Sequence, residues 1–393
     1  MVILGIESSC DETAAAVVED GVHVRSSVVA SQVSLHEEYA GVVPEIASRA
    51  HVEQILPVMR EALAQAGIGL GRIEAIAVGN RPGLIGCLLV GVNAAKALAW
   101  SLGVPLVGVD HVAAHLYSGM LHEREEFKMD GGGESASGGG ENAESHHGRF
   151  PALGLVISGG HTAMYSLEGW TKASRIGSTI DDAVGEAYDK VAAILGLAYP
   201  GGPNVDGLAR EEGANPKAVT LPVSRLGTDS LDFSFSGLKT AVLYAARGVP
   251  GQRDREGTLL EQPAALDHAR KRDIAASFQD TAAKTIILKL ERALGVLRAR
   301  HGKVESLFVG GGVSANSKIR VELEAFAKRE GLVYEPPRLA YCVDNAAMIA
   351  GLGYWLLQAK REGREGREGR EGGVGGESSL GLDLEAMPST SIT

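Results

Sequence analysis

The sequence opens with VILGIESSCDETAAAVVEDGVHVRSSVVA (residues 2–30), and a similar stretch, ALGLVISGGHTAMYSLEGWTKASRIGS (residues 152–178), begins its second half. Each stretch has three short apolar or alternating segments separated by polar turns, which is typical of three successive β-strands. The predicted strands are Val2–Glu7, Thr13–Glu19 and His23–Ala30, then Ala152–Ile157, Thr162–Leu167 and Ala173–Ser178. This internal repeat predicts a duplicated architecture.

Alternating helices and strands follow each stretch. The first half continues with a helix at Pro44–Ala66, a strand at Ala75–Val78, a helix at Leu84–Leu102, a strand at Pro105–Val109 and a helix from His111. The second half continues with a helix at Asp182–Leu195, a strand at Ser306–Val309, a helix at Ser317–Glu330, a strand at Val333–Glu335 and a helix at Asp344–Leu357. The order βββαβαβα occurs twice and predicts an α/β protein with mostly parallel sheets flanked by helices. We expect a duplicated actin-like ATPase fold, as in sugar kinases and heat-shock ATPases; two unrelated α/β domains are the alternative.

The expected domains are two lobes. Residues 1–130 form the first actin-like lobe, and the last helix, 344–358, can pack back on it. Residues 149–343 form the second lobe with a helical insertion, and a cleft between the lobes would hold the ligand. Residues 131–148 are rich in Gly, Ser and Glu and predict a flexible insertion, and the repeats that begin the tail at 361–393 predict disorder. Neither segment shows an apolar face, so both are expected to be dispensable.

Composition indicates a soluble intracellular protein. The apolar stretch Gly83–Trp100 contains Asn93 and Lys96 and predicts a buried helix rather than a membrane span. The sequence has three cysteines, none in a CxxC pair, and it starts without the basic segment of a signal peptide. A cytoplasmic protein with no membrane association is expected.

The net charge restricts how the protein can bind nucleic acid. The 393 residues carry a formal charge of −11, whereas nucleic-acid-binding domains are usually basic. Binding to a polyanion therefore requires a local basic patch or a partner that supplies one. Lysines and arginines suited to such a patch are Arg49, Arg81, Lys239 and Arg338, although each could also be an ordinary solvated charge.

A histidine pair follows the predicted strand Pro105–Val109. Residues four apart lie on one face of a helix, so His111 and His115 can present two imidazoles to one metal ion. A solvated or packed pair of histidines has the same spacing. A carboxylate supplied by the fold would complete a set of two histidines and one acid, which suits Fe(II) or Zn(II).

Two glycine-rich turns follow apolar strands. In Ser158-Gly159-Gly160-His161-Thr162 the paired glycines allow backbone N–H groups to approach a phosphate closely. The turn Gly310–Asn316 lies between a strand and a helix and can admit a ribose or adenine ring. Neither turn has the P-loop spacing GxxxxGK[ST]. The expected ligand of these turns is an adenylate or an ATP-type nucleotide. The alternative is that they are plain glycine turns that bind nothing.

Acidic residues accompany these turns. The group Asp181, Asp182, Glu186, Asp189 and Lys190 would line one face of the following helix, which also describes an ordinary solvated face. Near the end of the sequence, Asp344 is placed to cap the last predicted helix.

Eight motifs in fixed order resemble the TsaD family of tRNA-modifying transferases. They are GIESSCDETAAAVV, HVAAHLYS, ISGGHT, DDAVGEAYDK, YPGGP, LDFSFSGLKT, GGGVSAN and CVDNAAMIA. The resemblance covers nearly all of Val2–Leu357, so the insertion and the tail lie outside it.

The resemblance implies an acyltransferase. Such an enzyme transfers the threonylcarbamoyl group from threonylcarbamoyl-AMP to N6 of the adenosine 3′-adjacent to the anticodon, in tRNAs that read codons beginning with adenine. It implies His111, His115 and Asp344 as metal ligands, with iron the usual ion. It implies substrate contacts at Ile157, Ser158, Gly159, Gly160, His161, Asp189, Gly202, Asp206 and Asn316. Asp11, with Glu12, matches a motif tied to catalysis.

The resemblance also implies partners and separates rival functions. The expected partners are tRNA, TsaB bound through the first lobe, the ATPase TsaE and the synthase that supplies threonylcarbamoyl-AMP. A zinc metallopeptidase would need HExxH, but Val112 stands where its glutamate would be. An actin-fold small-molecule kinase would not need the histidine pair. A TsaB-like scaffold would lack the second-half motifs.

Overall fold

The computed structural model describes residues 1–39, 41–123, 148–248, 266–368 and 381–389, which form two compact units. Unit 1 comprises Met1–Phe150, Glu168–Ala173 and Asp344–Thr393, and unit 2 comprises Pro151–Leu167 and Ser174–Val343. Residues 131–147 of the expected insertion lie outside the described residues. Because the chain returns to unit 1 at Asp344, this residue and the histidine pair belong to the same unit.

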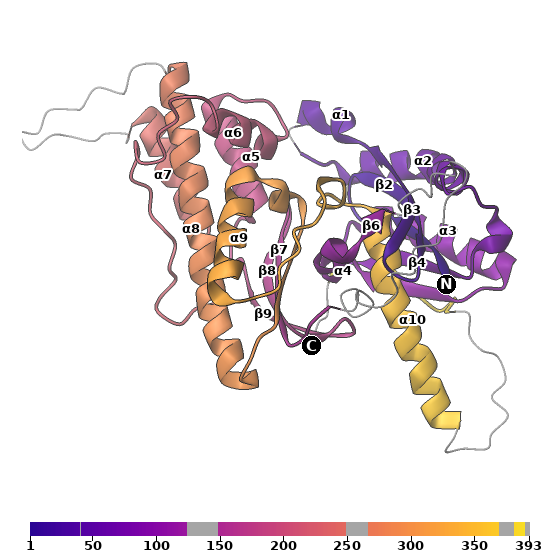
Figure 1. Cartoon of the computed structure of the whole chain (residues 1–393). Coiled ribbons are helices and arrows are strands. Elements are labelled where there is room, and N and C mark those ends of the chain that lie inside the picture. The colour runs from indigo at the N-terminus through magenta and orange to yellow at the C-terminus, as the bar shows by residue number, and fades with distance from the viewer. Residues whose placement is uncertain (40, 124–147, 249–265, 369–380, 390–393) are drawn as a thin grey trace, which may run out of the picture. The chain divides into compact units, whose positions relative to one another are not determined.

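Unit 1 contains a six-stranded mixed sheet with the order β5-β4-β1-β2-β3-β6 (Figure 1). Its strands are β1 Val2–Glu7, β2 Glu12–Glu19, β3 His23–Ser31, β4 Ala75–Arg81, β5 Leu106–Asp110 and β6 His122–Glu123. β1 pairs antiparallel with β2 but parallel with β4, and β4 pairs parallel with β5. The carboxyl ends of β1, β4 and β5 therefore meet at one edge, which is where open α/β sheets bind ligands.

Helices cover both faces of this sheet. They are α1 Val33–His36, α2 Pro44–Gln65, α3 Ile85–Leu102, α4 His111–Tyr117 and α10 Ala346–Glu368, with short 3-10 turns at Glu37–Tyr39, Leu70–Arg72 and Ser118–Met120. Alternation along β1 separates the faces: Leu4 and Ile6 join the apolar cluster formed with α2 and α3, whereas Gly5 faces α10. A Cβ on Gly5 would lie 2.2 Å from the carbonyl oxygen of Ala346, so α10 packs against bare backbone.

Helix α3 is long and apolar enough to cross a membrane by length and composition alone. Its Val92, Ala95 and Ala99 pack into the apolar cluster of unit 1, as the sequence predicts for a core helix. Only 33% of the helix is buried, however, and its exposed positions include Leu89 and Trp100. The helix is thus a core element of unit 1 whose outer face is also partly apolar.

Unit 2 repeats the opening pattern around a four-stranded sheet with the order β10-β7-β8-β9. Its strands are β7 Ala152–Ile157, β8 Thr162–Gly169, β9 Lys172–Ser178 and β10 Ser306–Gly310, and its helices are α5 Val184–Leu195, α6 Gly201–Ala209, α7 Ser236–Arg247, α8 His268–His301 and α9 Ser317–Glu330, with 3-10 turns η5 Gly312–Ala315 and η6 Leu339–Tyr341. The strand predicted at Val333–Glu335 is wrong. Only Val333 forms a bridge, to Ser306, because the segment beyond it leaves the edge of β10.

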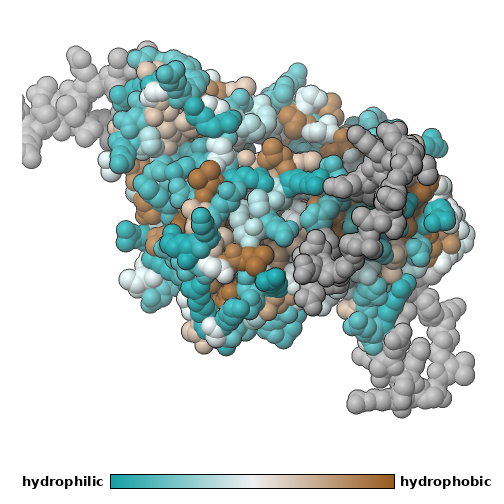
Figure 2. Space-filling model, viewed as in Figure 1, coloured by the Kyte–Doolittle hydropathy of each residue, from teal (hydrophilic) through white to brown (hydrophobic). Residues whose placement is uncertain are grey.

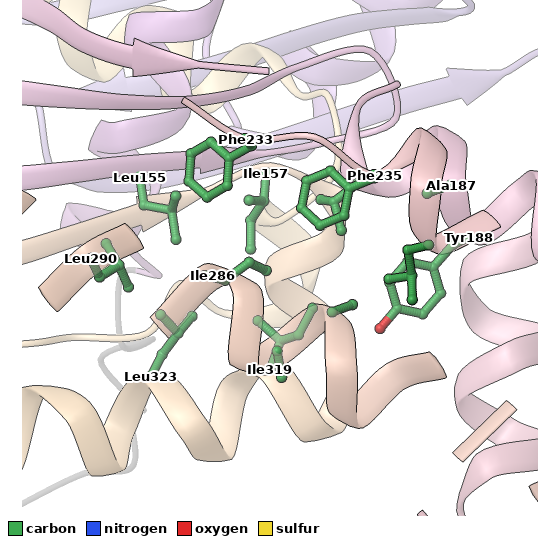
Figure 3. Packing of buried hydrophobic residues seen from close by; sticks show 14 of the residues in the cluster. Leu155, Ile157, Ala187, Tyr188, Phe233, Phe235, Ile286, Leu290, Ile319 and Leu323 are labelled. Carbon is green, nitrogen blue, oxygen red and sulfur yellow. The ribbon is translucent and has the colours of Figure 1, made fainter. Parts of the chain in front are cut away.

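The core of unit 2 lies between the sheet and the long helix α8. Leu155 and Ile157 of β7 face Ile286 and Leu290 of α8, and Ile319 of α9 closes the cluster (Figure 3). These side chains are fully or almost fully buried. On the visible outer face of α8 and α9, hydrophilic residues predominate, with smaller hydrophobic patches among them (Figure 2). Because Ile157, the last residue of β7, belongs to this cluster, the packed core anchors the turn that follows β7.

The C-terminal segment differs from the sequence prediction of disorder. Helix α10 continues to Glu368, and Gly381–Ser389 packs on unit 1. Asn80 Nδ2 donates a hydrogen bond to the carbonyl oxygen of Glu385 at 2.8 Å, and Met387 N donates to the carbonyl oxygen of Asn80 at 2.8 Å. The side chains that contact the unit 1 cluster are Leu382, Leu384 and Ala386. Their alternation supplies an apolar face that the preceding repeats lack.

Truncation after Lys360 is therefore expected to destabilise the protein, contrary to the expectation from sequence. Partial burial of two leucines and an alanine contributes on the order of 2 kcal/mol. The melting temperature should fall by roughly 4–8 °C. Differential scanning fluorimetry of the full and truncated chains measures this change, with Leu384→Ser as a point variant that should account for part of it. An unchanged melting temperature would show that the segment contributes nothing to folding.

Candidate metal centre and phosphate-binding loops

The histidine pair lies in helix α4, directly after β5 in unit 1. Asp110 caps this helix, because its side chain accepts a hydrogen bond from Ala113 N at 3.0 Å. His111 and His115 lie one turn apart on the same face, with ring centroids 4.7 Å apart and ring planes at 81°. The two imidazoles converge as their spacing predicts.

Asp344 reaches the same point from the other end of the chain. Its Oδ1 lies 3.1 Å from Nε2 of His115 and 3.4 Å from Nε2 of His111. The prediction that Asp344 caps the last helix is wrong. Helix α10 begins at Ala346, and Asn345 Oδ1 accepts the capping hydrogen bond from Met348 N at 2.9 Å. Because Asn345 satisfies the helix end, the Asp344 carboxylate faces the histidines.

These three side chains fit a divalent metal ion. Their ligand atoms all lie within 4.8 Å of one another. Bonds of about 2.0–2.2 Å to a shared ion place neighbouring ligand atoms roughly 3 to 3.5 Å apart, which matches the two distances to Asp344. Nε2 of buried His115 lies near Asp344 without forming a hydrogen bond of good geometry. Such an unsatisfied nitrogen is expected where ligands share an ion rather than a proton.

Burial and neighbouring charges shift the pKa values of all three side chains. Burial lowers the pKa of His115. Burial acts on His111 in the same direction, but the charges of Asp344 and Glu7 outweigh it and raise the pKa of His111 well above its usual range. Burial would raise the pKa of Asp344, yet His111 holds it well below the ordinary value. A bound divalent ion would add positive charge beside Asp344 and Glu7.

The turn from β1 to β2 brings two more acids close to this group. Asp11 lies in the turn and Glu12 begins β2, where the Ser31 hydroxyl donates a hydrogen bond to Glu12 at 3.4 Å. Burial and the charges of Asp344 and Asp11 raise the pKa of Glu12 to about 9. Glu12 therefore lies within electrostatic reach of Asp344, one of the three predicted ligands.

Glu7 also belongs to this site, although it was not among the predicted ligands or catalytic residues. It ends the buried strand β1, and its Oε2 lies 3.1 Å from Nδ1 of His111. The hydroxyl of Ser9 lies 3.2 Å from the same nitrogen. An acid at the end of an otherwise apolar strand is the signal that could have pointed to it, because buried carboxylates are rarely unpaired.

In unit 2, the turn between β7 and β8 holds five of the predicted substrate contacts. Ile157 ends β7 and is buried, while Gly159 and Gly160 are exposed. Ser158 N donates a hydrogen bond to the carbonyl oxygen of His161 at 2.8 Å, and His161 N donates to the Ser158 hydroxyl at 3.1 Å. A Cβ on either glycine would meet nothing within 4 Å. The turn is thus closed by its own ends and open beside its glycines.

Two glycines from other motifs approach the backbone of this turn. A Cβ on Gly185 of α5 would lie 2.5 Å from the carbonyl oxygen of Ser158. A Cβ on Gly311 would lie 2.4 Å from the carbonyl oxygen of Ile157, and Gly311 has a φ of +93°. Three motifs that are distant in sequence therefore meet here, and only glycine allows two of them to approach so closely.

Asp189 of α5 lies beside Gly202 at the start of α6. Oδ1 of Asp189 accepts a hydrogen bond from Gly201 N at 2.7 Å, and Gly202 N also donates to this carboxylate. Burial raises the pKa of Asp189, and these hydrogen bonds oppose the rise. The structure thus shows Asp189 holding the start of α6, while substrate contact by either residue remains a prediction.

Asp206 and Asn316 are joined by a residue that the sequence did not indicate. Gln279 of α8 donates a hydrogen bond from Nε2 to Asp206 at 2.9 Å and accepts one from Asn316 Nδ2 at 2.9 Å. Asn316 also caps α9 by accepting hydrogen bonds from Lys318 N and Ile319 N. The two predicted substrate contacts are therefore parts of one buried polar network.

The acidic group before α5 has structural partners, contrary to the helical face predicted for it. Helix α5 begins at Val184, so Asp181 and Asp182 precede it. The Asp181 carboxylate accepts hydrogen bonds from backbone N–H and hydroxyl groups at the start of α7. Asp182 pairs with Lys190 at 2.6 Å and with Lys239 at 3.0 Å. These acids hold α5 and α7 together.

Comparison with solved structures supports the predicted fold. HypF of T. kodakarensis superposes with a TM-score of 0.53 at 17% identity, covering 91% of this chain and 48% of that one. At this identity the likeness shows the fold alone. The twice-repeated βββα opening, with helices packed on each sheet, is the duplicated actin-like architecture expected from the sequence.

Comparison with protein sequences shows the family. The model of the family TsaD, tRNA N6-adenosine threonylcarbamoyltransferase, matches residues 23–141 and 134–351. Three proteins of that name are similar to this chain over nearly their whole length. The protein of Moorella thermoacetica is 46% identical, and the match covers 90% of this chain and 91% of the relative. For Symbiobacterium thermophilum the identity is 47%, covering 91% of this chain and 92% of the relative, and for Bacillus subtilis it is 44%, covering 90% of each. With the motifs assembled as described above, this chain belongs to the TsaD family of tRNA N6-adenosine threonylcarbamoyltransferases.

Proposed function

We propose that this protein transfers the threonylcarbamoyl group from threonylcarbamoyl-AMP to N6 of the adenosine 3′-adjacent to the anticodon, in tRNAs that read codons beginning with adenine. The observation that carries the proposal is that a chain matching this family over residues 23–351 brings His111, His115 and Asp344 together. The reaction takes place in the cytoplasm, without a membrane.

The chemistry requires an activated donor. The exocyclic amine of adenine is a poor nucleophile, because its lone pair is delocalised into the ring. A mixed anhydride with AMP provides a good leaving group, and the enzyme must hold its phosphate. The open glycines of the Ile157–His161 turn supply backbone N–H groups for this purpose. Asp189, Gly202, Asp206 and Asn316 are the proposed further contacts to the adenylate.

The histidine pair and Asp344 are the proposed ligands of one divalent ion, Fe(II) first and Zn(II) second. When bound, the ion supplies Lewis acidity toward an oxygen of the donor. As the new bond to N6 forms, the amine must lose a proton. Asp11 and Glu12 are the proposed catalytic carboxyls, with Asp11 either accepting this proton or orienting the donor.

Rival activities receive no support from the site. A metallopeptidase of the HExxH type needs a glutamate beside its histidine ligands as a general base. Val112 occupies that position and is buried. A small-molecule kinase on the same fold would not require two imidazoles and a carboxylate around one point.

The proposal is tested by mass spectrometry of tRNA nucleosides. Unmodified tRNA is incubated with the protein, TsaB, TsaE, threonine, bicarbonate, ATP and the synthase that makes threonylcarbamoyl-AMP. Threonylcarbamoyladenosine should appear only when the protein is present, and only in tRNAs with adenosine at the target position. Absence of the modified nucleoside, with an active synthase, would overturn the proposed function.

The outer face of α2 and α3 is the proposed surface for TsaB. Val52 and Leu56 are 62% and 55% exposed one turn apart on α2, and Ile85 and Leu89 repeat that spacing on α3. The two helices pack against each other in unit 1. Exposed apolar residues at helical spacing on adjacent helices are typical of a surface that pairs with other helices. TsaE is proposed to join this pair.

Binding of tRNA is expected to be assisted and strongly dependent on salt. The net charge of −11 repels a polyanion. Of the four basic residues suggested by sequence, Arg81 lies 3.4 Å from Asp110 and Lys239 pairs with Asp182, whereas Arg49 is exposed on α2. Affinity that depends on phosphate contacts should fall by about 10³-fold or more between 50 and 200 mM salt.

Fluorescence anisotropy with labelled tRNA across a salt series measures this dependence, for the protein alone and with TsaB and TsaE. The complex should bind more tightly than the isolated chain at every salt concentration. Tight binding by the isolated chain that does not change with salt would contradict the prediction and indicate base stacking instead.

A further inference from the structure

Glu7 contacts the ring nitrogen of His111 that points away from Asp344. Its side chain is 1% exposed and lies at the carboxyl end of β1. Oε2 lies 3.1 Å from Nδ1 of His111, on the opposite side of the ring from Nε2, which faces Asp344. The imidazole is thus held between two acids, one on each nitrogen.

The geometry assigns both oxygens of this carboxylate. Oε1 accepts a hydrogen bond from Ser9 N at 2.6 Å, so Oε2 is the oxygen that faces His111. A Cβ on Gly79 of β4 would lie 2.3 Å from Oε2. The sheet therefore leaves space for this carboxylate by having glycine in the adjacent strand. A buried acid with a partner for each oxygen, and with glycine where a side chain would clash, is a built contact and not a chance approach.

We infer that Glu7 is the positioning residue of the metal centre. Oε2 of Glu7 faces Nδ1 of His111 at hydrogen-bond distance, so the carboxylate favours the tautomer in which Nδ1–H donates the hydrogen bond. That tautomer leaves Nε2 unprotonated, which is the state in which it can bind a metal ion. The contact also fixes the orientation of the ring. The inference deepens the proposed function and rests on its metal centre.

Ser9 makes a second, weaker contact in the same place. Its hydroxyl lies 3.2 Å from Nδ1 of His111, but a hydroxyl can either donate or accept and so does not determine which nitrogen carries the proton. The carboxylate alone favours the Nδ1–H tautomer. Loss of the Ser9 hydroxyl should therefore weaken metal binding less than loss of the Glu7 charge.

The test is metal affinity of the full chain. Glu7→Gln preserves the shape, but its single carbonyl oxygen cannot accept from both Ser9 N and His111 Nδ1. Zn(II) and Co(II) dissociation constants are measured by competition with a chromophoric chelator, together with the visible spectrum of bound Co(II). Partners of histidine ligands typically contribute 10- to 100-fold to metal affinity. Glu7→Gln should lower the affinity for both ions by that factor and alter the Co(II) spectrum. Ser9→Ala should change the affinity by less than about threefold.

Two controls distinguish loss of the contact to His111 from a general effect of charge removal and from misfolding. Glu61→Gln removes one charge from the exposed face of α2 and should leave metal affinity unchanged. Circular dichroism of the metal-free proteins reports folding, and Glu7→Asp replaces Glu7→Gln if the latter does not fold. The Glu7→Asp side chain keeps the negative charge but is one methylene shorter, so this variant should also lower the metal affinity.

Two outcomes would overturn the inference: a folded Glu7 variant with wild-type metal affinity, or a larger loss in Ser9→Ala than in Glu7→Gln. A third measurement, metal binding by the wild-type chain, tests the proposed function itself. If the wild-type chain binds no more metal than His111→Ala does, the metal centre itself is wrong. Wild-type binding that is unaffected in the Glu7 variants contradicts the role of Glu7 alone.

Discussion

Replacing His111 with alanine is expected to remove stoichiometric metal and to lower the rate of tRNA modification by more than about 100-fold, beyond the effect usual for loss of a supporting residue. His111 supplies one of the three converging ligand atoms. With one imidazole and one carboxylate remaining, the site holds too few protein ligands for tight binding. Elemental analysis of the purified variant and mass spectrometry of tRNA nucleosides measure the two effects.

The same substitution has a second consequence that the structure makes explicit. His111 lies 3.1 Å from Glu7 and 3.4 Å from Asp344, so its removal leaves a buried acid and a half-buried acid without their shared partner. Breaking a buried ion pair typically costs about 3–5 kcal/mol. The variant should fold but melt at a lower temperature than the wild type in the metal-free state.

A matched control for His111→Ala is His268→Ala. His268 is an exposed histidine of α8 that pairs with Glu211 in unit 2. Its removal should leave metal content and modification rate unchanged. Wild-type metal content in His111→Ala would disprove the proposed ligand set, whatever its effect on activity.

Replacing Gly311 with alanine is expected to be the most damaging single methyl addition near the Ile157–His161 turn, the proposed phosphate-binding turn. The new Cβ would lie 2.4 Å from the carbonyl oxygen of Ile157; that oxygen belongs to the backbone and the backbone also fixes the Cβ, so neither atom can rotate away. The φ of +93° adds strain for any residue with a side chain. Together these effects should destabilise the protein by on the order of 3 kcal/mol or more.

The displacement should also affect ligand binding, because Ile157 leads directly into the two open glycines. Chemical denaturation and calorimetric titration with an adenine nucleotide measure stability and binding separately. Gly331→Ala is the matched control: its φ is +68°, but a Cβ there would meet nothing within 4 Å. It should cost about 1–2 kcal/mol and leave nucleotide affinity unchanged. Equal effects of the two substitutions would show that the contact with Ile157 is unimportant.

The sequence by itself determined most of the secondary structure and the candidate ligands that are local in sequence. Strand β1 at Val2–Glu7 and helix α9 at Ser317–Glu330 coincide with their predicted ranges. The repeat of apolar residues every 2 positions in a strand and every 3.6 positions in a helix is a local property, set by which side of each element is buried. The spacing of His111 and His115 is local in the same sense, and so it was interpretable before the fold was known.

Only the tertiary structure decided which distant residues complete the site. Asp344 was recognisable as a helix cap or, by resemblance, as a ligand, and the observed capping by Asn345 leaves its carboxylate with the histidines. Glu7 looked like the end of an apolar strand until β5 and α4 placed His111 against it. Gly381–Ser389 has an apolar face only when unit 1 offers a surface to cover. In each case the deciding quantity is a contact between residues far apart in the chain, which depends on how side chains pack and not on any local pattern.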